Sequence, residues 1–333
     1  MNISVLFRAK LLLPAFLIFS CSGEKNNDNP GKGNTCIITD KSRLEEIAIF
    51  PSDNPLNQDI SMAQTDNRSG AIIALIGTPS VKADFGSGLW EGSPIGIPFI
   101  LFCGSQTKMP VIFRGNGYDD NYGNESDPGP YPIPLNAPVE GNGTGDSHVL
   151  GVDLDNGILY ELYNASVGDG AWEASSGAIW NLNTNDSRPL GWTSADAAGL
   201  PILPLLVRYD EIVKGTIDHA IRFTLTKSKV TRAFTLPASH LVGGTNTSPE
   251  APAPMGMRLR LKSGFDISGF SETNQVILKA MKNYGLILAD IGSDLYITGA
   301  PDERWDNDDL SQLKRVKATD FEVIQMGEIV TNP

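Results

Sequence analysis

Two acidic residues, Asp153 and Glu161, lie on either side of an Asp-Asn-Gly turn that ends at Gly157. The flanking residues 148–154 and 158–163 alternate apolar and polar side chains, which is typical of the two strands of a hairpin. We expect a three-residue loop with Gly157 in the left-handed conformation, because this register gathers the apolar side chains on one face. The register pairs Leu154 with Ile158, Val152 with Tyr160, and Leu150 with Leu162.

The opposite face of this expected hairpin carries Asp153, Glu161 and Tyr163. The two acids are diagonal neighbours there, with roughly 7–8 Å between their backbones. This range overlaps the carboxyl separations of retaining and inverting glycosidases, in which one acid protonates the leaving oxygen and the other attacks or activates water. Asp196 is a third candidate for this chemistry. The alternative is that the two acids only cover a solvated sheet face.

A second group of polar side chains lies among small residues in the sequence GWTSADAAGLP, which contains Trp192, Ser194 and Asp196. Small residues let a backbone and a ligand approach closely, so this group is a candidate pocket wall. The alternative is that Ser194 caps a short helix whose first turn accommodates Asp196. We expect Trp192, Tyr163 and Arg208 to contact a substrate.

The chain has three histidines, His148, His219 and His240, each beside or within an expected strand. Imidazoles bind metals such as zinc and act as acids or bases near neutral pH. However, no HxH, HxxxH or HExxH spacing is present. We therefore expect histidines that lie in the core with their hydrogen bonds satisfied.

The segment 115–146 holds six acids and no Lys or Arg, among many Gly, Asn and Pro residues. Long irregular loops of this kind inside a domain are usually functional or disordered. Asp119, Asp120 and Asp127 are candidate calcium ligands, because calcium accepts carboxylate and amide oxygens from flexible loops. The spacing of an EF-hand is absent, and a solvated loop is the alternative. No cofactor is required by the expected chemistry.

Several classes of protein are excluded by composition or by missing motifs. The formal net charge of −13 argues against a nucleic-acid binder, which needs a cationic surface. No nucleophile elbow, Walker A loop or dinucleotide fingerprint occurs. The sequence Gly145-Asp146-Ser147 is similar to the nucleophile block of GDSL esterases, but the later Asp-x-x-His of that family is absent. A serine hydrolase is therefore not expected.

The N-terminus resembles a bacterial lipoprotein signal, with Arg8 and Lys10 before the apolar run 11–19 and then Cys21. We expect residues 1–20 to be a signal peptide and 21–35 a tether lipidated at Cys21. The protein would then be extracytoplasmic and anchored by lipid alone to a bacterial membrane, and we expect this to be the outer membrane or cell surface. An ordinary cleaved signal is the alternative.

Two further cysteines, Cys36 and Cys103, remain after Cys21. In an oxidising compartment they can form one disulfide that holds the N-terminal strand, and two separate buried thiols are the alternative.

Residues 36–330 are expected to form a single β-rich domain, a β-sandwich or jelly roll. Apolar stretches separated by Gly, Pro and Ser predict strands between 71 and 104, including 71–76. Further strands are expected at 177–182, 220–226, 257–262, 286–290 and 295–298. One long peripheral helix is expected over 272–284, capped by Ser271 and ended by Gly285, and a short acidic helix near 306–313.

Three sequences, DSHVLGVDLDNGILYELYNA (146–165), GWTSADAAGLPILPLLVRYDE (191–211) and YGLILADIGSDLYITGAPDERWDNDDL (284–310), resemble those of a group of secreted bacterial proteins without an assigned reaction. The resemblance covers most of residues 50–325. It implies one globular unit and a carbohydrate context, and it transfers no catalytic residue.

These observations favour a secreted carbohydrate-active protein, with a glycoside hydrolase that uses paired carboxylates as the leading hypothesis. Trp90, Trp172, Trp180 and Trp192 are near Gly-rich loops and suit sugar contact, although core packing is the alternative for each. A non-catalytic glycan-binding surface lipoprotein would use the same aromatics without the acids. A third hypothesis is a polysaccharide lyase, in which Arg222 or Arg258 neutralises a uronate and Tyr163 or His240 removes a proton. The stripe of Arg258, Arg260 and Lys262 motivates that hypothesis.

Overall fold

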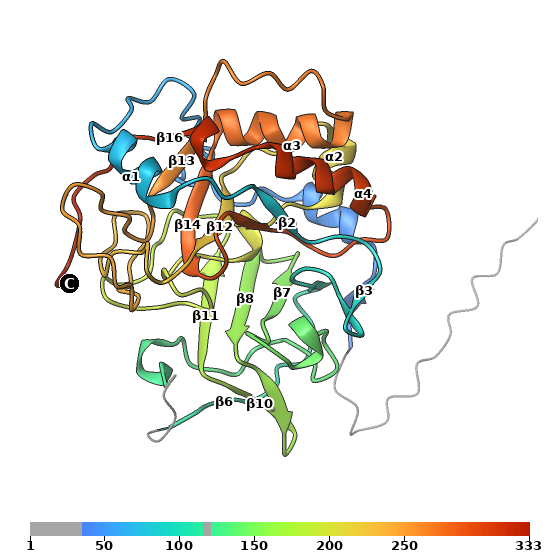
Figure 1. Cartoon of the computed structure of the whole chain (residues 1–333). Helices are drawn as coiled ribbons and strands as arrows, with labels where there is room; N and C mark the ends of the chain where they lie inside the picture. The colour runs from blue at the N-terminus through green and yellow to red at the C-terminus, as the bar shows by residue number, and fades with distance from the viewer. Residues whose placement is uncertain (1–34, 116–120) are drawn as a thin grey trace, which may run out of the picture. The chain divides into compact units, whose positions relative to one another are not determined.

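Two large sheets contain most of the strands in the computed structural model, which describes residues 35–115 and 121–333 (Figure 1). The expected signal peptide, Cys21 and nearly all of the tether lie outside these residues, as do Asp119 and Asp120. Residues Asn34–Pro333 form one compact unit.

The five-stranded sheet has the order β1-β5-β7-β8-β11. Its strands are β1 (Ile37–Ile38), β5 (Phe99–Phe102), β7 (Val149–Asp153), β8 (Ile158–Tyr163) and β11 (Ser176–Asn181). A disulfide between Cys36 and Cys103 joins the segment before β1 to the segment after β5, with 5.7 Å between the Cα atoms. The expected disulfide that holds the N-terminal strand is therefore present.

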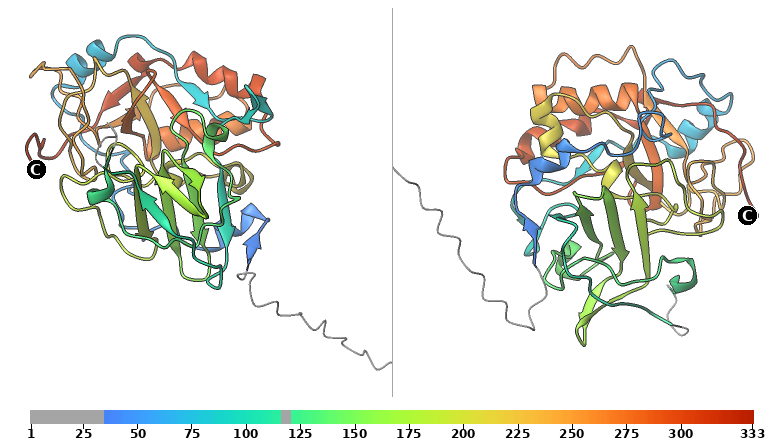
Figure 2. Two further views of the ribbon diagram at one scale, coloured as in Figure 1. Left: turned by 90° about the horizontal axis from the view of Figure 1, so that it is seen from below. Right: turned by 180° about the vertical axis from the view of Figure 1, so that it is seen from behind.

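The six-stranded sheet has the order β16-β13-β14-β12-β15-β2. Its strands are β2 (Lys82–Asp84), β12 (Ile221–Leu225), β13 (Arg258–Leu261), β14 (Leu286–Ile291), β15 (Tyr296–Thr298) and β16 (Phe321–Val323). In Figure 1 and in the right-hand view of Figure 2, helix α3 (Glu272–Asn283) lies on the side of this sheet away from the five-stranded sheet.

The remaining elements are small. They are the sheet of β6 (Val111–Phe113), β10 (Ala171–Ala174) and β9 (Ser166–Gly168), the pair β3 (Leu89–Trp90) and β4 (Ser93–Pro94), and the helices α1 (Ser69–Ile76), α2 (Tyr209–Lys214) and α4 (Asn307–Leu310). Short 3-10 helices occupy Lys41–Glu46, Gly123–Glu125, Glu140–Asn142, Leu203–Leu205, Ser311–Arg315 and Ala318–Asp320.

The expected long helix is confirmed as α3. The side chain of Ser271 accepts a hydrogen bond from the N–H of Asn274, which satisfies one of the free donors at the start of the helix. Gly285 follows the helix with a φ of 74°, a conformation that glycine adopts without strain. The apolar side chains of the helix are buried at helical spacing, which is how the sequence pattern identified it.

Residues 71–76 form part of helix α1, so the strand expected there is wrong. An apolar run of this length suits a buried helix and a buried strand equally well. Ser69, Ile72 and Ile76 are the buried positions, and their spacing is helical.

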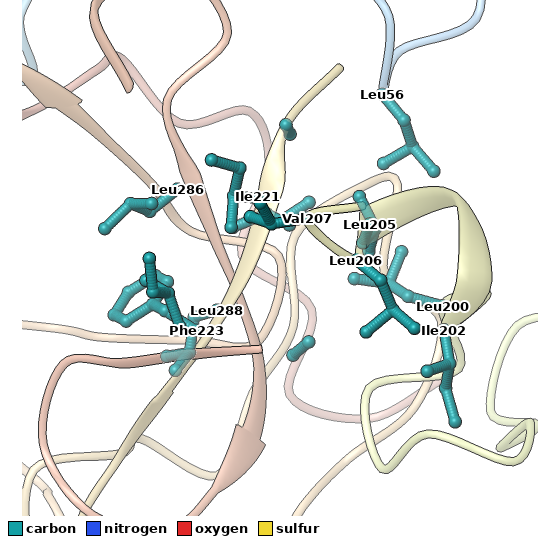
Figure 3. Close-up of a cluster of buried hydrophobic side chains, with 14 of the residues drawn as sticks. Leu56, Leu200, Ile202, Leu205, Leu206, Val207, Ile221, Phe223, Leu286 and Leu288 are labelled. Atoms are coloured by element: carbon teal, nitrogen blue, oxygen red, sulfur yellow. The ribbon is translucent and has the colours of Figure 1, made fainter. Parts of the chain in front are cut away.

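A large hydrophobic core connects the two sheets. Residues of the segment around the 3-10 helix Leu203–Leu205 pack near the buried faces of β12 and β14, as Figure 3 shows. The labelled members of this cluster are Leu56, Leu200, Ile202, Leu205, Leu206, Val207, Ile221, Phe223, Leu286 and Leu288.

The hairpin of β7 and β8 is present, but its expected register is wrong by one residue. Asp153 pairs with Ile158, and Leu150 pairs with Glu161. The expectation assumed one buried and one solvated face, whereas both faces of these strands are buried. Leu150 belongs to the core cluster between the sheets, and its neighbour Val149 belongs to a second cluster on the other face. Burial therefore could not choose between the two registers.

The β-rich fold class is confirmed. Both large sheets contain parallel pairs, namely β5 with β7, β12 with β14, and β15 with β2. A jelly roll is built from antiparallel strands, so that finer description is not established.

Candidate functional site

The expected acid pair is not formed, because Asp153 and Glu161 lie on opposite faces of the β7–β8 hairpin. Glu161 pairs with Leu150, which is three positions before Asp153 on β7, and side chains alternate faces along a strand. The carboxylate of Asp153 instead accepts hydrogen bonds from the backbone of Asp155 and from the backbone and side chain of Asn156. It stabilises the turn.

Glu161 is fully buried, and its carboxyl group accepts hydrogen bonds from buried N–H groups of the core. Its Oε1 atom accepts the N–H groups of Ile202 and Leu203 at 2.9 Å each, and its Oε2 atom accepts the indole N–H of Trp180 at 3.0 Å. Burial raises the pKa of Glu161 to about 7, although these donors oppose the shift. The side chain has no exposed surface, so it does not reach a substrate.

A different group of polar side chains surrounds a cavity of about 300 Å³. Its chemistry-bearing lining residues are Tyr122, Asp146, His148, Tyr163, Asp196, His240 and Asp290. They come from the start of the 3-10 helix Gly123–Glu125, the loop before β7, the end of β8, the loops around 191–200 and 240–243, and the end of β14. Two of the expected site residues, Tyr163 and Asp196, are in this set.

The segment 191–200 forms one wall of the cavity as an irregular loop, not as a short capped helix. Ser194 holds the loop together, because its hydroxyl donates to the carbonyl of Leu200 at 2.6 Å and accepts the N–H of Asp196 at 2.9 Å. Gly199 has a φ of 71°, and a Cβ there would lie 2.7 Å from the carbonyl oxygen of Trp192. The small residues thus allow close backbone packing.

Asp290 reaches the cavity because of a β-bulge in β14. The parallel strands pair Phe223 with Leu288, but they pair the next residue, Thr224, with Asp290. Ala289 is therefore an extra residue in the ladder. Bulges are common beside active sites, where they redirect a side chain.

The bulge turns the side chain of Asp290 to the sheet face that carries Arg222, since side chains alternate along a strand. The carbonyl of Ala289 also accepts the N–H of Ala198 at 3.0 Å, which joins the bulge to the 191–200 loop. The bulge therefore positions both the side chain of Asp290 and the loop that forms one wall of the cavity.

Arg222 links two of the acids beside the cavity. It binds Asp196 through two nitrogen–oxygen contacts of 2.7 and 2.9 Å, and its Nη2 atom also donates to Asp290 at 2.9 Å. Burial raises the pKa of Asp290 to about 7; Arg222 opposes this shift, whereas the negative charges of Asp196 and Asp146 add to it. Asp290 is therefore a carboxyl group that can hold a proton near neutral pH.

His148 is buried as expected, but it is charged. Its Nδ1 atom lies 2.5 Å from a carboxylate oxygen of Glu140, and its Nε2 atom lies 3.1 Å from the carbonyl oxygen of Ala195. Both partners are acceptors, so both ring nitrogens donate. Burial alone would lower the pKa of His148, but Glu140 outweighs it and raises the pKa to about 9. This imidazolium is a structural cation and not a general base at neutral pH.

The other aromatic groups of the cavity lie in pairs. The rings of His148 and Tyr163 have centroids 5.7 Å apart, and those of Tyr122 and His240 are 5.9 Å apart in an edge-to-face arrangement. The Nδ1 atom of His240 lies 2.8 Å from the carbonyl oxygen of Ala197. His240 therefore donates from Nδ1, and its Nε2 atom lies 3.8 Å from a carboxylate oxygen of Glu125.

Asp146 supplies an exposed carboxylate at the edge of the cavity. The sequence singled out this residue only through the resemblance to GDSL esterases. Asp290 was missed altogether, because it ends an apolar strand and the bulge that redirects it has no local sequence signal.

Three expected contact or ligand residues lie elsewhere. Trp192 packs under the guanidinium of Arg188, which is 5.5 Å from its ring centroid. Arg208 is buried and bonded to Glu211 at 2.6 Å, outside the cavity lining. Asp127 forms an ion pair with Arg188, so its carboxylate is occupied by a cation already.

The arginines of the proposed basic stripe are also occupied. Arg258 is buried and donates to the carbonyl groups of Pro55 and Tyr284. Arg260 is buried too, and it holds Glu322 and the carbonyl of Ile60. These side chains anchor loops and do not form a surface for a uronate.

Of the expected tryptophans, Trp172 and Trp180 are core residues and Trp90 is exposed. No helix in residues 35–115 and 121–333 is both long and apolar enough to cross a membrane. Within the same ranges, no group of three or more His, Cys, Asp or Glu side chains is arranged to hold a metal ion. Comparisons with protein-family models, curated proteins and solved structures find no match.

Proposed function

We propose that the protein hydrolyses glycosidic bonds in the cavity beside β14, with Asp290 as the proton donor and Asp146 as the carboxylate that attacks or activates water. The observation that carries this proposal is geometric: the bulge directs the partly buried carboxyl group of Asp290 into a cavity whose edge holds the exposed Asp146. The raised pKa of Asp290, caused by burial, supports it. Glycosidases need one protonated and one ionised carboxyl group at the same pH.

The two acids have environments that favour this division of roles. Asp290 is surrounded by protein, which disfavours its charged form, whereas Asp146 is exposed to water. The charge of Asp146 also acts on Asp290 and helps it to keep its proton. Asp196 has a fully buried side chain bound to Arg222, so its role is to position Arg222 and not to touch the sugar.

A lyase receives less support from the same residues. Tyr163 and His240 both line the cavity, as that hypothesis requires. However, Arg222 already holds two carboxylates and Arg258 donates to backbone carbonyl groups. Neither guanidinium group therefore has a free pair of N–H donors for the carboxylate of a uronate.

We also propose a lipid-anchored location outside the cytoplasm. The lipoprotein-like sequence that ends at Cys21 supports it. The disulfide between Cys36 and Cys103 gives independent support, since such bonds persist in oxidising compartments.

The test is an assay of new reducing ends on a panel of neutral, amino and uronate polysaccharides, with absorbance near 235 nm followed in parallel because lyases create an unsaturated product. We expect reducing ends without absorbance, and at least a hundredfold loss of turnover in Asp290→Asn and Asp146→Asn. Glu328→Gln removes one exposed acid outside the cavity and is the matched control.

Two outcomes would reject this assignment. Retained turnover in Asp290→Asn would remove the proton donor from the mechanism. Glycan binding without any product from the unmodified protein would favour the glycan-binding alternative.

A further inference from the structure

The charges around the cavity are unbalanced once its internal ion pairs are counted. Two cations lie beside it, Arg222 and His148, and each is already bound to an acid of its own. A third basic side chain, His240, also lines the cavity, and its Nε2 atom lies 3.8 Å from a carboxylate oxygen of Glu125. Arg222 is neutralised by Asp196, and His148 by Glu140. Among the described residues that line the cavity there is no Lys or Arg.

Two further carboxyl groups, those of Asp146 and Asp290, face the same space. When Asp290 holds its proton, Asp146 leaves an excess of one negative charge; when Asp290 ionises, the excess is two. Tyr122 and Tyr163 also line the cavity, and the faces of aromatic rings attract ammonium groups. A cavity with walls of one sign concentrates ligands of the opposite sign.

We infer that the cavity selects saccharides that carry a protonated amine, such as glucosamine units, over neutral sugars and uronates. This inference rests on the proposed function, since it names the substrate class of the same site. An ammonium group in the cavity gains attraction from Asp146 and meets no fixed cation without a partner. A uronate carboxylate would be repelled by Asp146 and would find no cation without a partner. Such repulsion lowers affinity in a site partly shielded from water.

The matched ligands for the test are the chitosan trimer, its N-acetylated counterpart and cellotriose, which differ in the substituent at one ring position. Binding is measured by calorimetry at about pH 6, where the sugar amine is protonated, on the unmodified protein and on Asp146→Asn. We expect the chitosan trimer to bind at least tenfold more tightly than the other two, and Asp146→Asn to remove most of that difference. Glu328→Gln should keep it, because Glu328 is exposed and does not line the cavity, and the charge of an exposed group is screened by salt.

The outcomes separate the inference from the proposed function. Turnover of cellotriose equal to that of the chitosan trimer, with no effect of Asp146→Asn on relative affinity, would overturn the inference and leave the hydrolase. Selective binding of the chitosan trimer without turnover of any sugar would support the inference and overturn the hydrolase. Tighter binding of an oligouronate than of the chitosan trimer would overturn the inference outright.

Discussion

Arg222 and Asp196 form an ion pair through two contacts, with 2.7 Å between Nε and Oδ2 and 2.9 Å between Nη2 and Oδ1. Both side chains are almost completely buried. The same guanidinium also holds Asp290. The proton donor of the proposed mechanism is thus positioned by a cation whose own charge is balanced by a second acid.

This pair predicts a large effect of Asp196→Ala on stability. The substitution leaves the guanidinium of Arg222 buried beside Asp290 alone, and breaking a buried pair in this way costs about 3–5 kcal/mol. Chemical denaturation of the variant measures this loss directly. The double variant Asp196→Ala with Arg222→Met should lose less than Asp196→Ala alone. A loss below about 1 kcal/mol in Asp196→Ala would show that the pair contributes little.

We expect the substitution Asp196→Asn to shift the pH profile of activity. The proposed proton donor, Asp290, works only while protonated, so kcat/KM should fall as the pH rises through about 7. The negative charge of Asp196 helps to raise the pKa of Asp290, and its removal also frees Arg222 to stabilise the ionised form. The falling limb should therefore move to lower pH. An unchanged limb in Asp196→Asn would mean that another group donates the proton.

Local patterns in the sequence predicted some of the regular elements. The apolar spacing within 272–284 identified α3, and the alternation around Gly157 identified the β7–β8 hairpin. The register of that hairpin was wrong because its strands are buried on both faces, which the sequence of two strands alone does not reveal. The strand expected at 71–76 was wrong for a similar reason, since a short apolar run fits either a helix or a strand.

The candidate site was only partly predictable for a different reason. Tyr163 and Asp196 stood out because polar groups close to strands and small residues often line pockets. Asp290 depends on the parallel pairing of β12 with β14, whose sequences are about 60 residues apart, and on the bulge at Ala289. Such long-range pairing leaves no periodic signal. Asp153 and Glu161 were attractive only in a register that the chain does not adopt.

Glu161 provides a stability prediction that separates its structural role from catalysis. In Glu161→Gln the amide must point a donor either at the indole N–H of Trp180 or at the N–H groups of Ile202 and Leu203. The amide nitrogen cannot accept a hydrogen bond, whereas either oxygen of the protonated carboxyl group can. Leaving one of these N–H groups without an acceptor costs about 1–3 kcal/mol, so the variant should be less stable at acid pH. Thermal or chemical unfolding measures the effect, with Glu328→Gln as the control. A variant of full stability that has lost turnover would instead restore Glu161 as a catalytic candidate.

The same substitution should change how stability depends on pH. The pKa of Glu161 is raised to about 7 in the folded protein, above its usual value of 4.5, so folding becomes less favourable as the pH rises from about 4.5 to 7. Glutamine cannot ionise, so the variant does not lose this part of its stability as the pH rises. The stability gap between the unmodified protein and Glu161→Gln should therefore shrink by up to about 3 kcal/mol across that range. A gap that is constant with pH would contradict the raised pKa.

The final prediction concerns His148, which is a base, whereas Glu161 is an acid. Its pKa is raised by Glu140 to about 9, above the usual value of 6.5, so its contribution to stability is complete below about pH 6.5 and is lost as the pH rises toward 9. Glu140→Gln removes the charge that raises the pKa, and burial should then bring it below the usual value. Because the chain has only three histidines, NMR titration of the ring protons can follow each one. A His148 that titrates near 6.5 in the unmodified protein would show a neutral imidazole at the cavity, which could then act as a base.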